Sequence, residues 1–302
     1  MQYHYKHNIK GLIMAFGMAF RNLKRNLMEH PFLTALTLFY ITFNFLVTKF
    51  KIRKLFGFLN AIKIKIKLPD GNILVCKIPD LITINEIYFA RVYDSLDCPD
   101  GSLIVDAGAN IGVYSLRMAT QKRNAIIVAV EPLGENFVLL KENIEKNGLR
   151  NIIPVNVALD RKTGHTKLFY NKAQGTTASF IIGENTQTEE VRSVRLDDLL
   201  PELGIDIRDK RLCIKMDVEG AELNVLEGAQ NLLKNKNISI LMETHPWLLA
   251  PEKLETFLKS HGFETKLLDL NQPFILARKQ SKLHNVAGIR GNRVQFDHRN
   301  FS

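Results

Sequence analysis

Short apolar runs alternate with helical stretches from residue 103 onward, and this alternation limits the possible folds more than any other feature of the sequence. We expect strands at Leu103–Asp106, Ile126–Glu131 and Ile152–Ala158, with helices between them at Ile111–Thr120 and Gly134–Asn147. Strands that alternate with helices form parallel sheets, because right-handed crossovers place a helix over each pair of strands. The sequence therefore predicts an α/β fold with a doubly wound, mostly parallel sheet.

The alternation is interrupted after residue 160 and then resumes. Extra strands are expected at Lys167–Tyr170 and Val191–Leu196, on either side of a Gly-, Thr- and Asn-rich segment, residues 171–188. That segment suits a lid or acceptor-recognition loop, with an ordinary solvated hairpin as the alternative. The later elements are expected to be strand Leu212–Met216, helix Ala221–Leu233, strand Ile238–Met242, helix Pro251–His261, and a closing antiparallel pair at Phe263–Leu268 and Pro273–Ala277.

The region before the sheet predicts a hairpin followed by a helix. Apolar and basic residues alternate in Ala61–Pro69, and Asp70 and Gly71 lead into a second apolar run, Ile73–Ile78, which is typical of a β-hairpin. Helical spacing follows at Ile84–Tyr93. We therefore divide the chain into a basic N-terminal extension (1–60), a hairpin and helix (61–100), the α/β domain (101–278) and a basic, flexible tail (279–302).

The net charge of +10 is concentrated at the two ends of the chain. Residues 1–67 contain 12 Lys and Arg and one acid, and residues 278–302 contain six and one, so the body between them carries −6. Basic ends favour contact with an anionic membrane surface or a polyanion, although they could also be solvated arms. The acidic body makes nucleic acid an unlikely partner.

An apolar helix is expected at about residues 31–48, where the sequence has no Lys, Arg, Asp or Glu. It is close to the minimum length for crossing roughly 30 Å of hydrocarbon, and its threonines reduce its apolarity. The alternatives are a helix lying in the membrane interface, a spanning helix and a helix buried against protein. The three cysteines form no CxxC pair, so we expect a cytoplasmic protein, possibly membrane-associated.

The sequence DAGANIG, residues 106–112, joins the first expected strand to its helix and indicates a nucleotide-binding turn. Gly108 would allow a tight turn and close approach to a ligand, while Gly112 would let the following helix pack near the strand. Glu131 ends the second strand, where a carboxylate can accept hydrogen bonds from ribose hydroxyls. Asp106 would repel a pyrophosphate but attract a sulfonium and an ammonium group. The turn therefore favours S-adenosylmethionine over a nicotinamide cofactor.

Three carboxylates, those of Asp217, Glu219 and Glu222, follow the strand at Leu212–Met216, at the edge of the sheet where α/β proteins bind ligands. Methyl transfer to an alcohol needs a group that orients the hydroxyl and accepts its proton, and Asp217 is our first candidate. Glu219 and Glu222 are candidates for the acceptor side of the site. Alternatively, these two acids only stabilise the first turn of the next helix.

The next strand ends at Glu243 and His245, which could face the same cleft as Asp217. Glu243 is then a further acceptor-side candidate, and His245 is a second candidate for the proton acceptor. These three residues could in principle bind a divalent cation, but their spacing along separate strands does not establish a metal site, and none is predicted.

The sequence resembles the FkbM-type methyltransferases over roughly Leu68–Arg278. The resemblance lies in the runs LIVDAGANIGVYSLRMA, VAVEP, VNVALD, VRLDDLL and, most specifically, IKMDVEGAELNVLEGA. It implies a class I methyltransferase (Rossmann-like) fold, S-adenosylmethionine as methyl donor, and commonly a hydroxyl acceptor on a sugar, lipid or secondary metabolite. The basic N-terminal residues fall outside it.

The resemblance also implies roles for the residues of the shared motifs. The methionine side of the donor would be lined by Asp106, Gly108, Asn110 and Gly112. Glu131 would bind the ribose, and Asn156 or Ala158 would lie near the adenine. We expect an O-methyltransferase acting near a membrane on a glycan, glycolipid or lipid; a nicotinamide-dependent oxidoreductase and a non-catalytic, membrane-tethered adenosine-binding protein remain the alternatives.

Overall fold

A computed structural model describes residues 62–170, 178–179, 187–208, 210–246, 248–269 and 273–279, with six further residues between 31 and 42. Most of the helix expected at 31–48 lies outside the described residues, although these six are helical. The tail beyond residue 279 also lies outside them. Among the described helices, none combines the length and the apolar character needed to cross a bilayer.

The main sheet has seven strands in the order β12-β13-β11-β10-β3-β4-β5. Every neighbouring pair is parallel except those that involve β13, which runs antiparallel to both β11 and β12. This confirms the doubly wound, mostly parallel sheet with an antiparallel closing pair. The strands are β3 (Leu103–Ala107), β4 (Ile126–Val130), β5 (Ile152–Val155), β10 (Leu212–Met216), β11 (Ile238–Glu243), β12 (Glu264–Asp269) and β13 (Pro273–Arg278).

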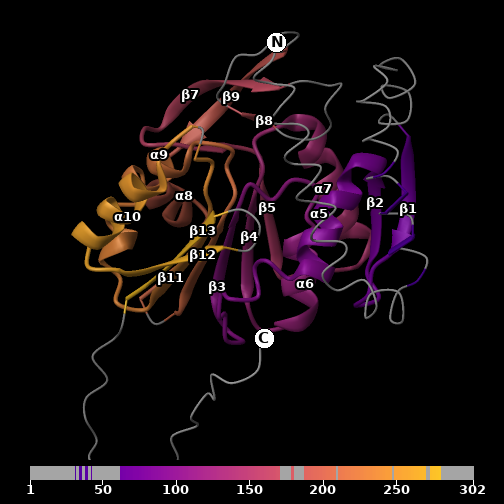
Figure 1. Ribbon diagram of the computed structural model, residues 1–302, viewed down its shortest axis with the longest axis horizontal. Helices are drawn as coiled ribbons and strands as arrows, with labels where there is room; N and C mark the ends of the chain where they lie inside the picture. Colours follow the sequence, from indigo (N-terminus) through magenta and orange to yellow (C-terminus); the bar gives the residue numbers. More distant parts are fainter. Residues whose placement is uncertain are drawn as a thin grey trace, which may run out of the picture.

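Helices cover both faces of this sheet (Figure 1). One buried apolar cluster joins α6 and α7 to one face, and a second joins α8, α9 and α10 to the other. Successive strand residues point to opposite faces, so Ile104 of β3 belongs to the first cluster and Val105 to the second. The helices are α5 (Leu81–Ile84), α6 (Val113–Gln121), α7 (Gly134–Lys146), α8 (Leu196–Glu202), α9 (Glu222–Glu227) and α10 (Pro251–Ser260).

The strand order reverses between β3 and β10, which are neighbours at the centre of the sheet. Ala107 pairs with Met216, so the turns that follow both strands meet at the same edge. They meet closely: a Cβ on Gly108, whose φ is +78°, would lie 1.8 Å from the carbonyl oxygen of Asp217. Gly108 is therefore required by contact between two backbones, and its lining of the donor site remains a prediction.

A second sheet, in the order β6-β9-β7-β8, is inserted between β5 and β10. The strand expected at Ile152–Ala158 is divided, because Asn156 donates to the carbonyls of Glu131 and Pro132 and the chain then leaves the main sheet. Of the segment expected at 171–188, only four residues are described, and all four are in strands. The strands are β6 (Ala158–Leu159), β7 (Gly164–Tyr170), β8 (Ala178–Ser179) and β9 (Gln187–Val194).

The helix expected at Ala221–Leu233 is shorter than predicted. It ends as α9 at Glu227, and a separate 3₁₀ turn follows at Leu232–Lys234. Gly228 packs against the chain at Asp160. A Cβ at this position would lie 2.2 Å from the Asp160 carbonyl oxygen, so there is no room for a side chain. The carboxylate of Asp197 then accepts the N–H groups of residues 231 and 232, which starts the new turn.

The predicted hairpin is present as β1 (Lys63–Lys67) and β2 (Ile73–Lys77), paired antiparallel. Its free β2 edge is bound by two side chains one turn apart, one in α7 and one at the residue that caps its C-terminus. Asn143 exchanges hydrogen bonds with both backbone groups of Val75, and Asn147 does the same with Ile73, at 2.7–3.0 Å. The amides thus replace a neighbouring strand.

The helix expected at Ile84–Tyr93 begins earlier. Helical turns run from a 3₁₀ turn at Ile78–Asp80 through α5 to a π-helical turn at Asn85–Ala90. Arg91, with a φ of +54°, then stops the helix in the left-handed conformation. Tyr93 consequently follows the helix instead of belonging to it, and this places its side chain at the end of the main sheet.

Candidate active site

Asp106 and Lys215 form a buried ion pair beneath the nucleotide-binding turn. The carboxylate of Asp106 is fully buried, accepts a 2.6 Å hydrogen bond from Ser115 Oγ, and lies 3.1 Å from Lys215 Nζ. Burial alone would lower the pKa of Lys215, but the carboxylates of Asp106 and Asp217 raise it, so the ammonium stays charged. It also donates to the carbonyl of Gly108 at 2.8 Å. Asp106 is thus neutralised within the protein, which corrects the argument that its free charge attracts the donor.

Glu131, which we expected to bind the ribose, is held in place by hydrogen bonds from the backbone, including the turn at residues 106–112. Its carboxylate accepts the N–H groups of Asn110 at 2.8 Å and Leu133 at 3.0 Å. Burial raises the pKa of Glu131 to about 7, although these hydrogen bonds act in the opposite direction. Asn110 has a φ of +52°, a conformation that asparagine tolerates better than most residues. The expected donor-side residues Asn110 and Glu131 are therefore in direct contact.

The other three residues expected on the donor side lie in different surroundings. Asn156 is next to Glu131, because its amide donates to the Glu131 carbonyl at 2.8 Å. Ala158 packs with Leu168 and Val191 in the core of the second sheet, so its side chain does not join the others. A Cβ on Gly112 would lie 2.6 Å from Leu140 Cδ1 of α7. This glycine therefore makes room for α7, whereas we had expected it to make room for the helix that directly follows it.

Tyr93 joins the two carboxylates that end β10 and β11. Its hydroxyl lies 3.3 Å from Asp217 Oδ2 and 3.3 Å from Glu243 Oε2. The Asp217 side chain is 30% exposed, whereas Glu243 is buried. Burial and the charges of Asp217 and Glu86 raise the pKa of Glu243 well above its ordinary value. Glu243 is therefore the member of the pair that keeps its proton.

His245 is clamped between two of the expected carboxylates. Its Nδ1 lies 2.8 Å from Glu222 Oε1, and its Nε2 lies 3.3 Å from Glu219 Oε2. Burial alone would lower the pKa of His245, but hydrogen bonds to Glu219 and Glu222 raise it to about 12. The ring is therefore a cation at neutral pH. An imidazolium cannot accept a proton, and this corrects the expectation that His245 competes with Asp217 as the base.

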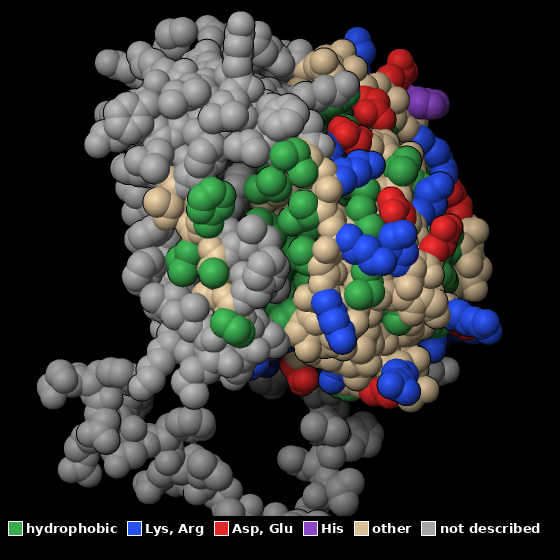
Figure 2. All heavy atoms as spheres, turned by 90° about the vertical axis from the view of Figure 1, so that its right-hand side faces the viewer, with side chains coloured by type: hydrophobic (Ala, Val, Ile, Leu, Met, Phe, Trp, Pro, Cys, Tyr) green, Lys and Arg blue, Asp and Glu red, His purple; other side chains and the backbone are tan. Residues whose placement is uncertain are grey.

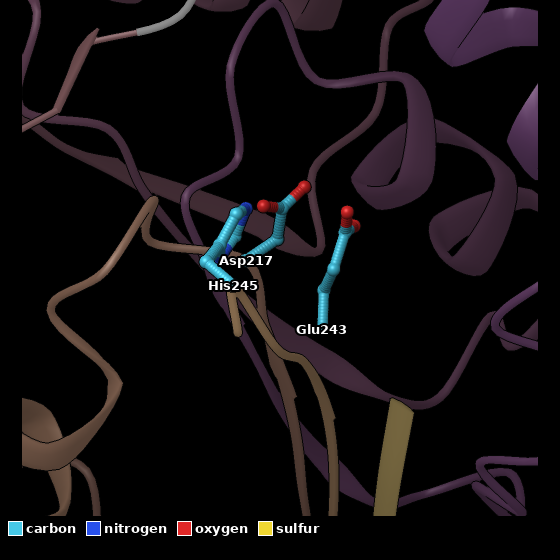
Figure 3. Close-up of side chains that lie close together, drawn as sticks. All are labelled: Asp217, Glu243 and His245. Carbon is cyan, nitrogen blue, oxygen red and sulfur yellow. The ribbon is translucent and has the colours of Figure 1, made fainter. Parts of the chain in front are cut away.

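Asp217, Glu243 and His245 converge at the end of the sheet (Figure 3). One potential ligand atom from each lies within 4.8 Å of the others, a spacing that a divalent cation could bridge. Both nitrogens of His245 already face carboxylates, however, so a metal ion would have to displace Glu219 or Glu222 from the ring. The cluster is accordingly described as a set of ion pairs and hydrogen bonds.

Two residues of this cluster, Tyr93 and Glu86, were missed by the sequence analysis. Burial and the charges of Asp217 and Glu219 raise the pKa of Glu86 to about 8, which brings this residue into the same group. Both come from the segment before the α/β domain, where only apolar spacing was considered. A single acid inside the apolar run NEIYFA was the signal that could have identified Glu86.

The completed site has more acids than bases. Five carboxyl groups and one imidazolium surround the ends of β10 and β11, next to the turn at Gly108, while Lys215 is already paired with Asp106. Carboxyl groups still outnumber the imidazolium when Glu86 and Glu243, whose pKa values are raised, are counted as protonated. A ligand that carries positive charge therefore fits the site, and a sulfonium with an ammonium group does so. The carboxyl groups belong to Glu86, Asp217, Glu219, Glu222 and Glu243.

A family model described as the methyltransferase FkbM domain matches residues 106–265. The chain is 28% identical over 222 residues to the methyltransferase sdnD of Sordaria araneosa, covering 63% of this chain and 84% of that protein. It is 25% identical over 187 residues to the hexuronic acid methyltransferase AglP of Haloferax volcanii, covering 61% and 74%. A crystal structure of FkbM from Methylobacillus flagellatus aligns with a TM-score of 0.44 at 14% identity, covering 76% of this chain and 59% of that one.

Proposed function

The chain belongs to the FkbM family of methyltransferases, whose methyl donor is S-adenosylmethionine, and on this premise we propose that it methylates a hydroxyl oxygen. The acceptor class that we propose is a sugar, glycolipid, lipid or secondary metabolite. One observation carries the proposal: the accessible carboxylate of Asp217 lies where the turns after β3 and β10 meet, next to the buried Glu243.

We assign donor binding to the turn after β3 and to Glu131. The hydrogen bond between Asn110 N and Glu131 fixes the two relative to each other, so little reorganisation is needed on binding. When bound, S-adenosylmethionine would supply an electrophilic methyl group on a sulfonium. The acid surplus at the adjoining strand ends complements that positive charge.

Asp217 is assigned to the acceptor. It would hold the hydroxyl group and accept its proton as the new O–CH3 bond forms and the C–S bond of the donor breaks. Glu219 and Glu222 have a supporting role in this proposal, because His245 binds both and fixes the turn that carries Asp217. A matching role in acceptor binding is proposed for Glu243 through its contact with Tyr93.

The outer face of the hairpin supports an acceptor at a membrane surface. Lys63, Lys65 and Lys67 are all exposed along β1, and Phe39, in the helical residues near it in the sequence, is 66% exposed. Figure 2 shows this side of the molecule, where basic side chains, with acidic ones among them, lie beside a group of apolar side chains. Anionic headgroups favour such a combination.

Calorimetric titration of the full-length protein with S-adenosylmethionine, S-adenosylhomocysteine and NAD tests the assignment of the donor site. We expect both adenosyl compounds to bind and NAD not to bind. The acceptor is then sought by following S-adenosylhomocysteine release with neutral glycosides, uronic acids and lipid vesicles that contain glycolipid. Binding of NAD alone, or donor binding with no transfer to any hydroxyl acceptor, would overturn the proposal.

A further inference from the structure

The ring of Tyr93 is fixed from several sides. It makes edge-to-face contacts with Tyr114 and Phe274, at 5.5 and 5.6 Å between ring centroids. Lys215 Nζ lies 5.3 Å from the centroid of the Tyr93 ring. The side chain is almost fully buried. Its hydroxyl group therefore has little freedom to choose its partners, and those partners are the carboxyl groups of Asp217 and Glu243.

A hydroxyl group has one proton, but two carboxyl groups contact this one. If both were ionised, one would face the lone pairs of the phenol oxygen at 3.3 Å without a proton between them, at a high cost in a buried site. The cost is removed when one carboxyl group is protonated and donates to the phenol oxygen. Glu243 is buried and Asp217 is partly exposed, so the proton stays on Glu243.

We propose that Tyr93 is a positioning residue for the transfer step, in a directed chain in which the Glu243 carboxylic acid donates to the Tyr93 oxygen and the Tyr93 hydroxyl donates to Asp217. This proposal rests on the proposed function. The chain fixes one oxygen of Asp217, so that the other is available to an acceptor hydroxyl. No net proton moves along the chain during the transfer; the proton from the acceptor goes to Asp217.

Several other charged groups face Asp217 and also affect its ionisation. Lys215 approaches from β10, with its Nζ 4.0 Å from Asp217 Oδ2. Glu86 from the π-helical turn and Glu219 from the same loop also face it, and a ring nitrogen of His245 lies within 4.8 Å of one of its oxygens. These groups are unchanged by removal of the Tyr93 hydroxyl, so its effect can be measured separately.

The variant Tyr93→Phe keeps the ring and its three aromatic and cationic contacts. We expect its affinity for S-adenosylhomocysteine to stay within about twofold and kcat to fall about tenfold. A carboxylate that loses a donor is protonated more easily, so the acid limb of the kcat profile should move to higher pH by about one unit. Tyr114→Phe is the matched control, because it removes a hydroxyl from the same aromatic cluster, where that group faces Cys98. It should leave the profile unchanged.

A second measurement needs neither donor nor acceptor. Infrared spectra of protein with ¹³C-labelled glutamate carboxyls should show carbonyl stretches of protonated acids at neutral pH, to which Glu86 and Glu131 also contribute. The band of interest is the component that is lost in Glu243→Gln. In Tyr93→Phe the band should shift to higher frequency, because the acid loses the oxygen to which it donates; in Tyr114→Phe it should not. An unshifted band, or an unchanged acid limb with only a lower melting temperature, would overturn the role of Tyr93. Failure of transfer in the unmodified protein, with the band still shifted by Tyr93→Phe, would count against the proposed function alone.

Discussion

The two halves of the sheet edge satisfy their charges in different ways. After β3 and β4, each carboxylate is matched by fixed partners: Asp106 by Ser115 and Lys215, and Glu131 by backbone N–H groups. After β10 and β11, carboxyl groups outnumber cations and are close enough to raise one another's pKa values. The carboxylates of the first half are fixed by hydrogen bonds and an ion pair. In the second half, Asp217 and Glu243 contact the same Tyr93 hydroxyl and compete for its proton. Binding and proton transfer are therefore assigned to different strands.

The largest effect is expected from Lys215→Met, which removes the only cation beside the buried Asp106 among the described residues. A buried carboxylate without its partner costs about 3–5 kcal/mol of unfolding free energy. Urea denaturation measures this loss. Lys236→Met, at an exposed lysine with no ion pair in the described part of the chain, is the control. A loss below about 1 kcal/mol would mean that Asp106 does not depend on Lys215.

Asp217→Asn separates the two halves functionally. It removes the proton acceptor with little change in shape, so we expect kcat to fall by about 10²–10⁴-fold. Donor affinity, measured by calorimetry, should change less than about threefold. The comparison fails if Asp217→Asn weakens donor binding and leaves transfer intact at saturating donor.

Glu131→Gln should give the opposite result. The amide accepts hydrogen bonds through one oxygen instead of two, so donor binding should weaken about tenfold, or about 1.4 kcal/mol, with kcat little changed at saturating donor. Glu135→Gln provides the control. Glu135 is exposed in the first turn of α7 and forms an ion pair with Lys77 of β2. Loss of kcat in Glu131→Gln with unchanged donor affinity would place Glu131 in the transfer half.

The last prediction concerns the dependence of stability on pH, which is measured as a slope. The folded pKa of His245, about 12, is above its ordinary value of 6.5, so its stabilising contribution is complete below about pH 6.5 and is lost as the pH rises toward 12. The stability difference between the native protein and His245→Gln should therefore shrink between about pH 7 and 10, by up to about 1.4 kcal/mol per pH unit. His165→Gln, at an exposed histidine, should show no such trend. A difference that is constant with pH would exclude the imidazolium.

The main sheet could be predicted from the sequence because its signals are local. Leu212–Met216 is apolar enough and bounded clearly enough that the predicted and observed limits of β10 agree. The segment around Ile84 could not be located, because its apolar spacing fits more than one helical start. The division after Val155 depends on a side chain of Asn156 reaching back to β4, which no periodicity reveals.

The candidate site was predictable only at the level of which strand ends carry acids. The pairing of strands brings Asp217 and Glu243 together, and topology predicts this. The state of His245 depends on Glu219, whose left-handed backbone turns it toward the ring, and such a turn is not visible in the sequence. Tyr93 was missed because a residue that follows a helix can reach a distant strand only through the three-dimensional fold.

The second sheet leaves the main one after β5 and returns before β10, and its strands β6 and β9 lie side by side. Its entry and exit are thus close together, so residues could be added to or deleted from β7 and β8 without altering the register of the seven-stranded sheet. A hydrogen bond from Gly134 N to Glu189 Oε1 ties it to the beginning of α7. In evolutionary terms the insertion is a module that can be lengthened or shortened while the seven-stranded sheet is inherited unchanged.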